Sequence, residues 1–145
     1  MLTSMTTDQA PDFNRSPQEL EASDWGDPEA DDTLMVKTLH AIRRKPVNSL
    51  TDGELRLAVS QRVGEPFVVL LAIDRLERAP LLDGDCYPGD ILSALIRQTS
   101  QSVWDSYPQL RAKLTTLYNR ALAATPDEAE SFRESLGLPS DGSQQ

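Results

Sequence analysis

The chain has 145 residues, of which 39% are hydrophobic and 26% are charged, and its formal net charge is −9. This length predicts one domain with one hydrophobic core and is too short for two. The single cysteine, Cys86, excludes an intramolecular disulfide, and the single histidine, His40, leaves a multi-histidine metal site without its parts.

The negative charge is concentrated near the N-terminus. Residues 1–33 contain nine acids and one base, Arg15, whereas the rest of the chain contains 14 acids and 13 bases. An acidic protein without a basic stripe is a poor candidate for nucleic-acid binding, because neutralised phosphates supply most of that affinity. Its expected partner is a basic protein, and the alternative is a solvated segment that only confers solubility.

No segment indicates a membrane protein or a secreted one. The longest apolar run, residues 67–73, is far shorter than the roughly 20 residues that span a bilayer. The N-terminus does not place a basic segment before an apolar one, as a secretory signal does. We therefore expect a cytoplasmic protein that does not contact membranes.

The first elements are short and polar. Residues 1–15 lack periodicity and are expected to be a disordered tail. Ser16 and Glu19 form a capping-box pattern with Pro17 at the first helical position, which predicts a short helix ending near Ser23. Residues 24–32 contain a glycine, a proline and many acids, and they predict a loop, called the acidic loop below. The acids of this loop, together with one further on, are our candidate partner-binding residues: Asp24, Asp27, Glu29, Asp31, Asp32 and Asp83.

An amphipathic helix is predicted over residues 33–44. Its apolar positions recur at spacings of one, three and four, and we expect them to face the core: Leu34, Met35, Leu39 and Ile42. The basic triplet Arg43, Arg44 and Lys45 follows, and it complements the negative end of the helix dipole. The alternative for this triplet is a contact with nucleic acid.

The next two helices are expected to build the core. Thr51 and Glu54 form a second capping box, which opens a helix that ends at Gly64. The apolar run that starts at Phe67 continues to Arg78, and its length favours a helix buried nearly all round over a strand. This helix is the predicted centre of the core.

Residues 81–90, the glycine–aspartate loop, combine three carboxylates with two glycines and a proline. We expect Pro88 at the first helical position, so that Asp90 lies in the first turn, where the helix dipole favours a negative charge. Two carboxylates about 4 Å apart repel by about 1 kcal/mol in water and about 4 kcal/mol at an effective dielectric near 20. Backbone N–H groups or a cationic partner should therefore satisfy the set Asp83, Asp85 and Asp90.

The acidic set Asp83, Asp85 and Asp90 allows three chemical interpretations and a structural one. An EF-hand loop starting at Asp83 would find Tyr87, Pro88 and Ala94 at its fifth, sixth and twelfth positions, and it fails. A small metal-dependent hydrolase using Asp83, Asp85 and Asp90 stays as the alternative function, although no second acidic pair accompanies them. A general acid–base pair would need a cleft that separates the environments of its carboxylates. The structural interpretation has the carboxylates cap backbone amides.

The remaining chain continues the helical pattern. Trp104 and Tyr107 flank a short segment, and Pro108 begins a helix with a regular apolar stripe that ends near Leu122. Thr125 opens a third capping box and a helix to Gly137. The fold class is all-α, a single-domain bundle of about six antiparallel helices over residues 16–138, with a tail at 139–145. No cofactor and no metal are implied.

Several of these residues carry a resemblance to a known family. It begins with Leu20-Glu21 and Asp24-Trp25, and it continues through Leu55-Arg56-Leu57 with Gln61, then Ala72 and Leu76. It is densest at Pro80-Leu81, Gly84-Asp85 and Tyr87-Pro88-Gly89-Asp90-Ile91-Leu92, and it ends at Trp104. The series resembles the immunity proteins of bacterial contact-dependent growth inhibition over roughly residues 16–107. It departs from their pattern at Ala79, Cys86 and Ile91 without damaging it.

The resemblance implies a small cytoplasmic protein without catalytic activity or a small-molecule substrate. Such a protein binds and neutralises the C-terminal toxin domain delivered by neighbouring cells, as a heterodimer. These toxins are often nucleases, many of which cut transfer RNA, and a nuclease surface is basic. Because family members meet different toxins, the resemblance also implies that the shared segment is scaffold. Its residues here are Gly84, Asp85, Tyr87, Pro88, Gly89, Asp90 and Trp104.

Overall fold

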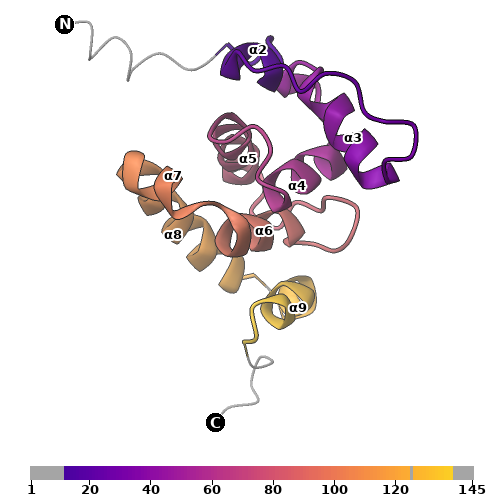
Figure 1. Cartoon of the computed structure of the whole chain (residues 1–145). Coiled ribbons are helices and arrows are strands. Elements are labelled where there is room, and N and C mark those ends of the chain that lie inside the picture. Colours follow the sequence, from indigo (N-terminus) through magenta and orange to yellow (C-terminus); the bar gives the residue numbers. More distant parts are fainter. Residues whose placement is uncertain (1–11, 125, 139–145) are drawn as a thin grey trace, which may run out of the picture.

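The computed structural model describes residues 12–124 and 126–138, and this part of the chain is all helical (Figure 1). It contains eight α-helices and one 3₁₀ turn, η1, and within it the chain forms no strand. The all-α prediction is confirmed, although the helices are more numerous than the six expected. The elements are α2 (Pro17–Glu21), α3 (Leu34–Arg43), η1 (Val47–Ser49), α4 (Asp52–Ser60), α5 (Phe67–Arg78), α6 (Asp90–Gln98), α7 (Gln101–Ser106), α8 (Pro108–Leu122) and α9 (Pro126–Ser135).

The segment before α2 differs in part from the expected tail. Residues 1–11 lie outside the described residues, but residues 12–15 form a turn closed by the Arg15 N–H on the Asp12 carbonyl, 3.0 Å apart. The backbone N–H of Val47 donates to the Arg15 carbonyl over 2.9 Å, which ties this turn to η1. Hydrogen bonds therefore already shape the described chain before Ser16.

Two of the three predicted capping boxes are confirmed. The Ser16 hydroxyl accepts from the Glu19 N–H, and the Glu19 carboxylate accepts from the Ser16 N–H, at 3.1 and 2.9 Å. Thr51 and Glu54 repeat this arrangement at the start of α4, with the same two distances. The third box, at Thr125, lies outside the described residues.

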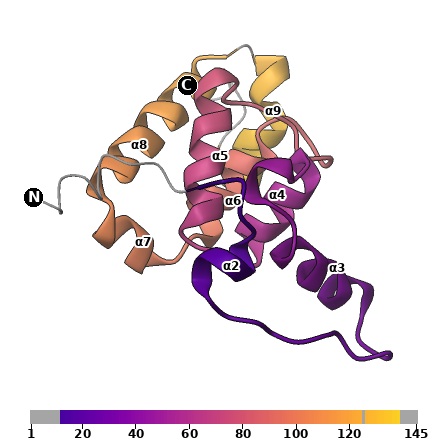
Figure 2. The same ribbon diagram turned by 90° about the horizontal axis from the view of Figure 1, so that it is seen from above.

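Helix α5 is the centre of the core, as its sequence predicts. Its buried residues are Val68, Val69, Leu71, Ala72, Ile73 and Leu76, and α4, α6 and α8 pack against it. Figure 2 shows α5 between α8 on one side and α4 on the other. Among the described helices, α5 buries the most apolar residues. Each fully buried aliphatic side chain contributes about 1.5 to 3 kcal/mol to stability.

The start of α6 differs from the expectation. Pro88 is not at the first helical position, because α6 begins at Asp90 and Gly89 is its N-cap residue with φ +89°. Pro88 instead pairs with Asp83 in an isolated antiparallel bridge, which folds residues 83–88 back on themselves. Asp90 is nevertheless in the first turn, as predicted.

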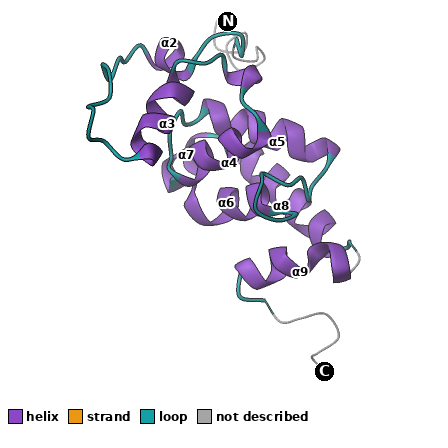
Figure 3. Ribbon diagram, turned by 90° about the vertical axis from the view of Figure 1, so that its right-hand side faces the viewer, coloured by secondary structure: helices purple, strands orange, loops and turns teal. Residues whose placement is uncertain are grey.

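Helix α3 projects from the body together with the acidic loop (Figures 2 and 3). Leu39 and Ile42 are buried, as expected. Leu34 is not a core residue, since 80% of its surface is exposed, and Met35 is 44% exposed. The prediction that these two side chains face the core is wrong, because the first turn of α3 extends past the helices that could cover it.

Candidate functional site

Asp90 is the buried centre of the glycine–aspartate loop. Its residue is 3% exposed, and its two carboxylate oxygens accept three backbone N–H groups. Oδ1 accepts from Gly84 at 2.6 Å, and Oδ2 accepts from Cys86 at 2.9 Å and from Tyr87 at 3.2 Å. The Arg56 Nε lies 3.8 Å from Oδ2 and donates to the Gly84 carbonyl at 2.8 Å. The expected backbone and cationic partners are both present for this carboxylate, which thus holds the loop in one shape.

The two glycines of this loop occupy positions that have no room for a side chain. A Cβ at Gly84 would lie 2.8 Å from the Arg56 Cβ and 3.0 Å from the Asp52 carbonyl oxygen of α4. A Cβ at Gly89 would lie 2.9 Å from the Phe132 Cβ of α9, and the positive φ of this residue also disfavours any other amino acid. The loop is therefore wedged between α4 and α9.

The other residues of the predicted scaffold segment are arranged around this centre. The Asp83 carboxylate accepts from the Asp85 N–H at 2.6 Å, and both residues are exposed. Asp85 has φ +83° and rests on α4, where a Cβ at Gly53 would overlap its Oδ2. Tyr87 is half-buried and Pro88 is exposed. Trp104 is buried in α7, away from the loop in the chain, and belongs to the core.

This geometry does not favour the hydrolase alternative. Both oxygens of Asp90 already accept hydrogen bonds, and Asp83 and Asp85 are exposed, unlike Asp90. Among the described residues, no group of three or more histidine, cysteine, aspartate or glutamate side chains is placed to hold a metal ion. A buried carboxylate whose two oxygens accept three backbone hydrogen bonds is poorly placed to bind a metal ion or to transfer a proton.

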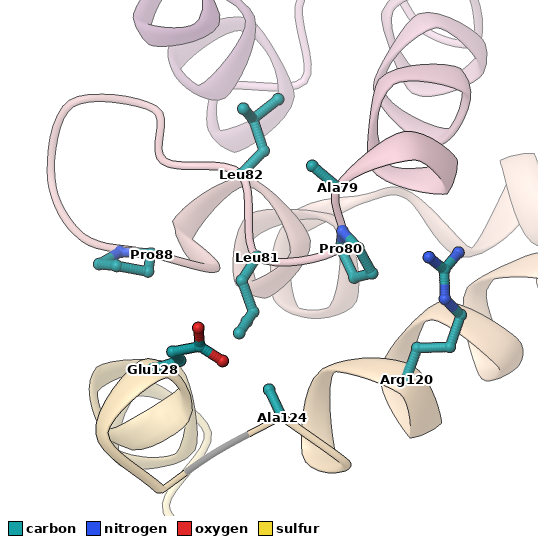
Figure 4. Close-up of a pocket in the computed structure, with 8 residues that line it drawn as sticks. All are labelled: Ala79, Pro80, Leu81, Leu82, Pro88, Arg120, Ala124 and Glu128. Atoms are coloured by element: carbon teal, nitrogen blue, oxygen red, sulfur yellow. The ribbon is translucent and has the colours of Figure 1, made fainter.

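A pocket of about 540 Å³ lies beside the glycine–aspartate loop (Figure 4). Its walls are mostly apolar, and Arg120 and Glu128 bring charges to it from α8 and α9. The Arg120 Nη1 donates to the Glu77 carbonyl at 3.0 Å, so this guanidinium also fastens α8 to α5. The full lining is Ala79, Pro80, Leu81, Leu82, Pro88, Arg120, Ala124 and Glu128.

The acidic loop is exposed along most of its length. Asp24, Asp27, Glu29 and Asp31 are exposed, and Asp32 is half-buried. The Asp24 carboxylate accepts from the Gly26 N–H at 2.7 Å, and the Asp32 carboxylate accepts from the Glu29 N–H at 2.7 Å. Local hydrogen bonds therefore shape this loop while its charges stay in contact with water.

Asp83 is not part of this acidic surface. It lies in the loop between α5 and α6, and Figures 2 and 3 show that loop and the acidic loop at separate places on the molecule. The structure thus brings five of the six candidate acids together and leaves the sixth elsewhere.

The basic triplet after α3 is engaged within the chain. Arg43 is buried, pairs with Glu21, and donates to the Ser23 carbonyl at 2.9 Å. Arg44 pairs with Asp27 at 2.9 Å. Lys45 pairs with Glu54 of α4. The triplet therefore does more than complement the helix dipole, because it joins α3 to the segments around it. The burial of Arg43 is a feature that helical periodicity does not reveal.

Trp25 is a second feature of this region that the sequence interpretation missed. Its ring lies over Arg43, with the guanidinium carbon 4.3 Å from the ring centroid, and it meets the His40 ring edge-on at 5.2 Å. The His40 Nδ1 is 3.1 Å from the Gly26 carbonyl oxygen. These contacts hold the start of the acidic loop against the C-terminal half of α3, and 49% of Trp25 still remains exposed.

Large apolar side chains are exposed near both ends of α3. Within the described ranges, the large hydrophobic residues that are exposed are Trp25, Leu34 and Met35, all within one stretch of chain. Single exposed apolar residues are ordinary, whereas a group rimmed by charges is typical of a protein-binding surface. The signal in the sequence was the tryptophan inside an otherwise acidic loop.

The described chain is an all-helical protein with a projecting acidic loop and exposed apolar side chains on α3 and in that loop. Comparison with protein families gives a match to the CDI immunity proteins over residues 19–114, where CDI stands for contact-dependent growth inhibition. This match spans well over half of the chain, and the chain belongs to the CDI immunity proteins. No curated protein sequence and no solved structure matches the chain significantly. None of the helices in the described part is both long and apolar enough to cross a membrane.

Proposed function

We propose that this chain binds and neutralises the C-terminal toxin domain of a contact-dependent growth inhibition system, as a one-to-one complex in the cytoplasm. The observation that carries the proposal is the family match over residues 19–114. The protein acts by stoichiometric binding and has no catalytic activity of its own. Its scaffold includes the glycine–aspartate loop around Asp90, and its partner-reading surface lies outside that loop.

The charge distribution supports a basic nuclease as the partner, of the kind that cuts transfer RNA. Enzymes that cut nucleic acid carry positive surfaces, because much of their affinity comes from neutralising phosphates. The acidic loop presents Asp24, Asp27, Glu29 and Asp31 to solvent on a segment that projects from the body. Complementary fields of this kind raise association rates by about 10- to 1000-fold, which suits an inhibitor that must intercept a toxin early.

The direct test uses the toxin domain encoded beside this chain. The two proteins should co-purify at a one-to-one ratio, and this chain should protect cells that express the toxin domain. In vitro, cleavage of transfer RNA by the toxin domain should fall linearly with added protein until the two are equimolar. Absence of a complex, or turnover of a phosphoester by this chain alone, would overturn the proposal.

The role of the acidic loop is tested by removing its charges. Replacing Asp24, Asp27, Glu29, Asp31 and Asp32 by Asn or Gln should slow association by about 10-fold or more at low salt and flatten its dependence on ionic strength. The control neutralises five exposed acids elsewhere, so that the net charge changes equally. These acids are Asp74, Asp105, Asp127, Glu130 and Glu134. Equal slowing by both variants would show that net charge alone matters and that the loop is not the contact.

A further inference from the structure

The first turn of α3 carries an apolar surface that the described part of the chain leaves largely exposed. Met35, Leu39 and Ile42 stand at positions i, i+4 and i+7, so they form one stripe along the helix. Their exposed fractions are 44%, 9% and 1%, in that order. The stripe that packs on the core therefore continues outward for one more turn, and Leu34 beside it is 80% exposed.

Local structure fixes this turn in place. The Thr33 hydroxyl accepts from the Val36 N–H at 3.2 Å and caps α3, and the Lys37 Nζ donates to the Ala30 carbonyl at 3.0 Å. Farther along the helix, Arg43 is buried and holds α3 through Glu21. Leu34 and Met35 are therefore presented on a preorganised helix end, which lowers the entropy cost of binding.

The charges around this turn indicate what covers it. The acidic loop runs directly into Thr33, and of the cations nearby Arg44 is paired with Asp27 while Lys37 is engaged by a backbone carbonyl. A second copy in a two-fold contact would bring the same carboxylates against one another. An anionic membrane surface would be repelled in the same way. A protein surface with lysine and arginine side chains around an apolar recess matches both the charge and the exposed side chains.

We infer that Leu34 and Met35 are the apolar anchor of the toxin interface, inserted into an apolar recess that basic residues border on the toxin domain. This inference rests on the proposed function and deepens it by dividing the surface into two roles. The carboxylates of the acidic loop attract the toxin and set the association rate. Leu34 and Met35 lose water in the complex and set the dissociation rate, as buried apolar anchors do.

The test compares two double variants bound to the toxin domain encoded beside this chain. Leu34→Gln with Met35→Gln keeps side-chain length and helix propensity but removes the apolar surface. Leu34→Met with Met35→Leu keeps the apolar surface and is the matched control. The glutamine variant should dissociate at least about 10-fold faster, with an unchanged association rate and an unchanged urea midpoint. The control should dissociate at the rate of the original protein.

The outcomes separate this inference from the proposed function. If the original protein does not bind the toxin domain, the proposed function fails. If it binds and the glutamine variant dissociates at the same rate, the proposed function stands and the anchor is overturned. Sedimentation velocity tests whether a second copy of this chain covers the surface. A dimer of the original protein that becomes monomeric in the glutamine variant would show that a second copy covers this surface, which also overturns the inference.

Discussion

The acidic loop and the glycine–aspartate loop have similar compositions and opposite structures. Both contain several aspartates and a glycine with positive φ, and both lead into a helix. In the glycine–aspartate loop, Asp90 is buried and accepts three backbone N–H groups. In the acidic loop, Asp24, Asp27, Glu29 and Asp31 are exposed. The difference teaches that burial and hydrogen-bond partners, more than the number of carboxylates, separate a loop that is fixed within the fold from a loop whose charges remain in contact with water.

Removing the Asp90 carboxylate should give the largest loss of stability. Asp90→Ala leaves the buried Gly84 N–H and the part-buried N–H groups of Cys86 and Tyr87 without their acceptor. A buried unsatisfied donor costs about 1 to 3 kcal/mol and part-buried donors cost less, so we expect the free energy of unfolding, measured by urea denaturation, to fall by about 2 to 3 kcal/mol. Asp90→Asn keeps one acceptor oxygen and should lose less.

The Asp90→Ala variant also tests whether the glycine–aspartate loop is scaffold or is itself the interface with the toxin domain. If Asp90→Ala unfolds at the original urea concentration and yet no longer binds the toxin domain, the glycine–aspartate loop is the interface. If stability falls and the folded fraction still binds with the original affinity, the loop is scaffold.

A glycine from each loop gives a matched pair of smaller effects. Gly89 and Gly26 have φ +89° and +78°, so alanine is strained by about 1 to 2 kcal/mol at either position. A Cβ at Gly89 would also lie 2.9 Å from Leu81 and Phe132 atoms, whereas a Cβ at Gly26 meets nothing within 4 Å. Gly89→Ala should therefore cost at least about 1 kcal/mol more than Gly26→Ala in urea denaturation. Equal costs would mean that the two loops are equally loosely packed.

The sequence was sufficient at two capping boxes and at the central helix, where the structure depends on neighbours in the chain. The capping boxes at Ser16 and Thr51 require residues three positions apart, and the length of the apolar run from Phe67 decides for a helix. Periodicity also placed Met35 correctly on one stripe with Leu39. It could not show that the stripe extends past the core, because that depends on where other helices end.

The candidate site could be predicted only where it depends on composition. The concentration of acids in residues 24–32 is a property of composition, and the structure shows most of them exposed. The burial of Arg43 under Trp25 and its pairing with Glu21 need contacts between elements distant in the chain. Pro88 is a different case, because its bridge to Asp83 lies within the same loop and still displaced it from the helical start that local rules favour.

The smallest expected effect concerns Glu54, whose burial lies between that of Asp90 and that of the exposed acids in the acidic loop. Burial raises its pKa, but hydrogen bonds from Lys45 and the Thr51 backbone outweigh this and hold the pKa below its usual value of 4.5. A carboxyl with a lowered folded pKa stabilises the protein above the unfolded pKa, and this contribution is lost as pH falls from about 4.5 through the lower folded value. Because Lys45 is about half exposed, the pair contributes only roughly 0.2 to 1 kcal/mol.

Urea midpoints from pH 6 to pH 3 should therefore separate the original protein from Glu54→Gln at pH 6 and converge at pH 3. A constant difference across this range would show that Glu54 contributes through packing and hydrogen-bond shape, independently of its charge.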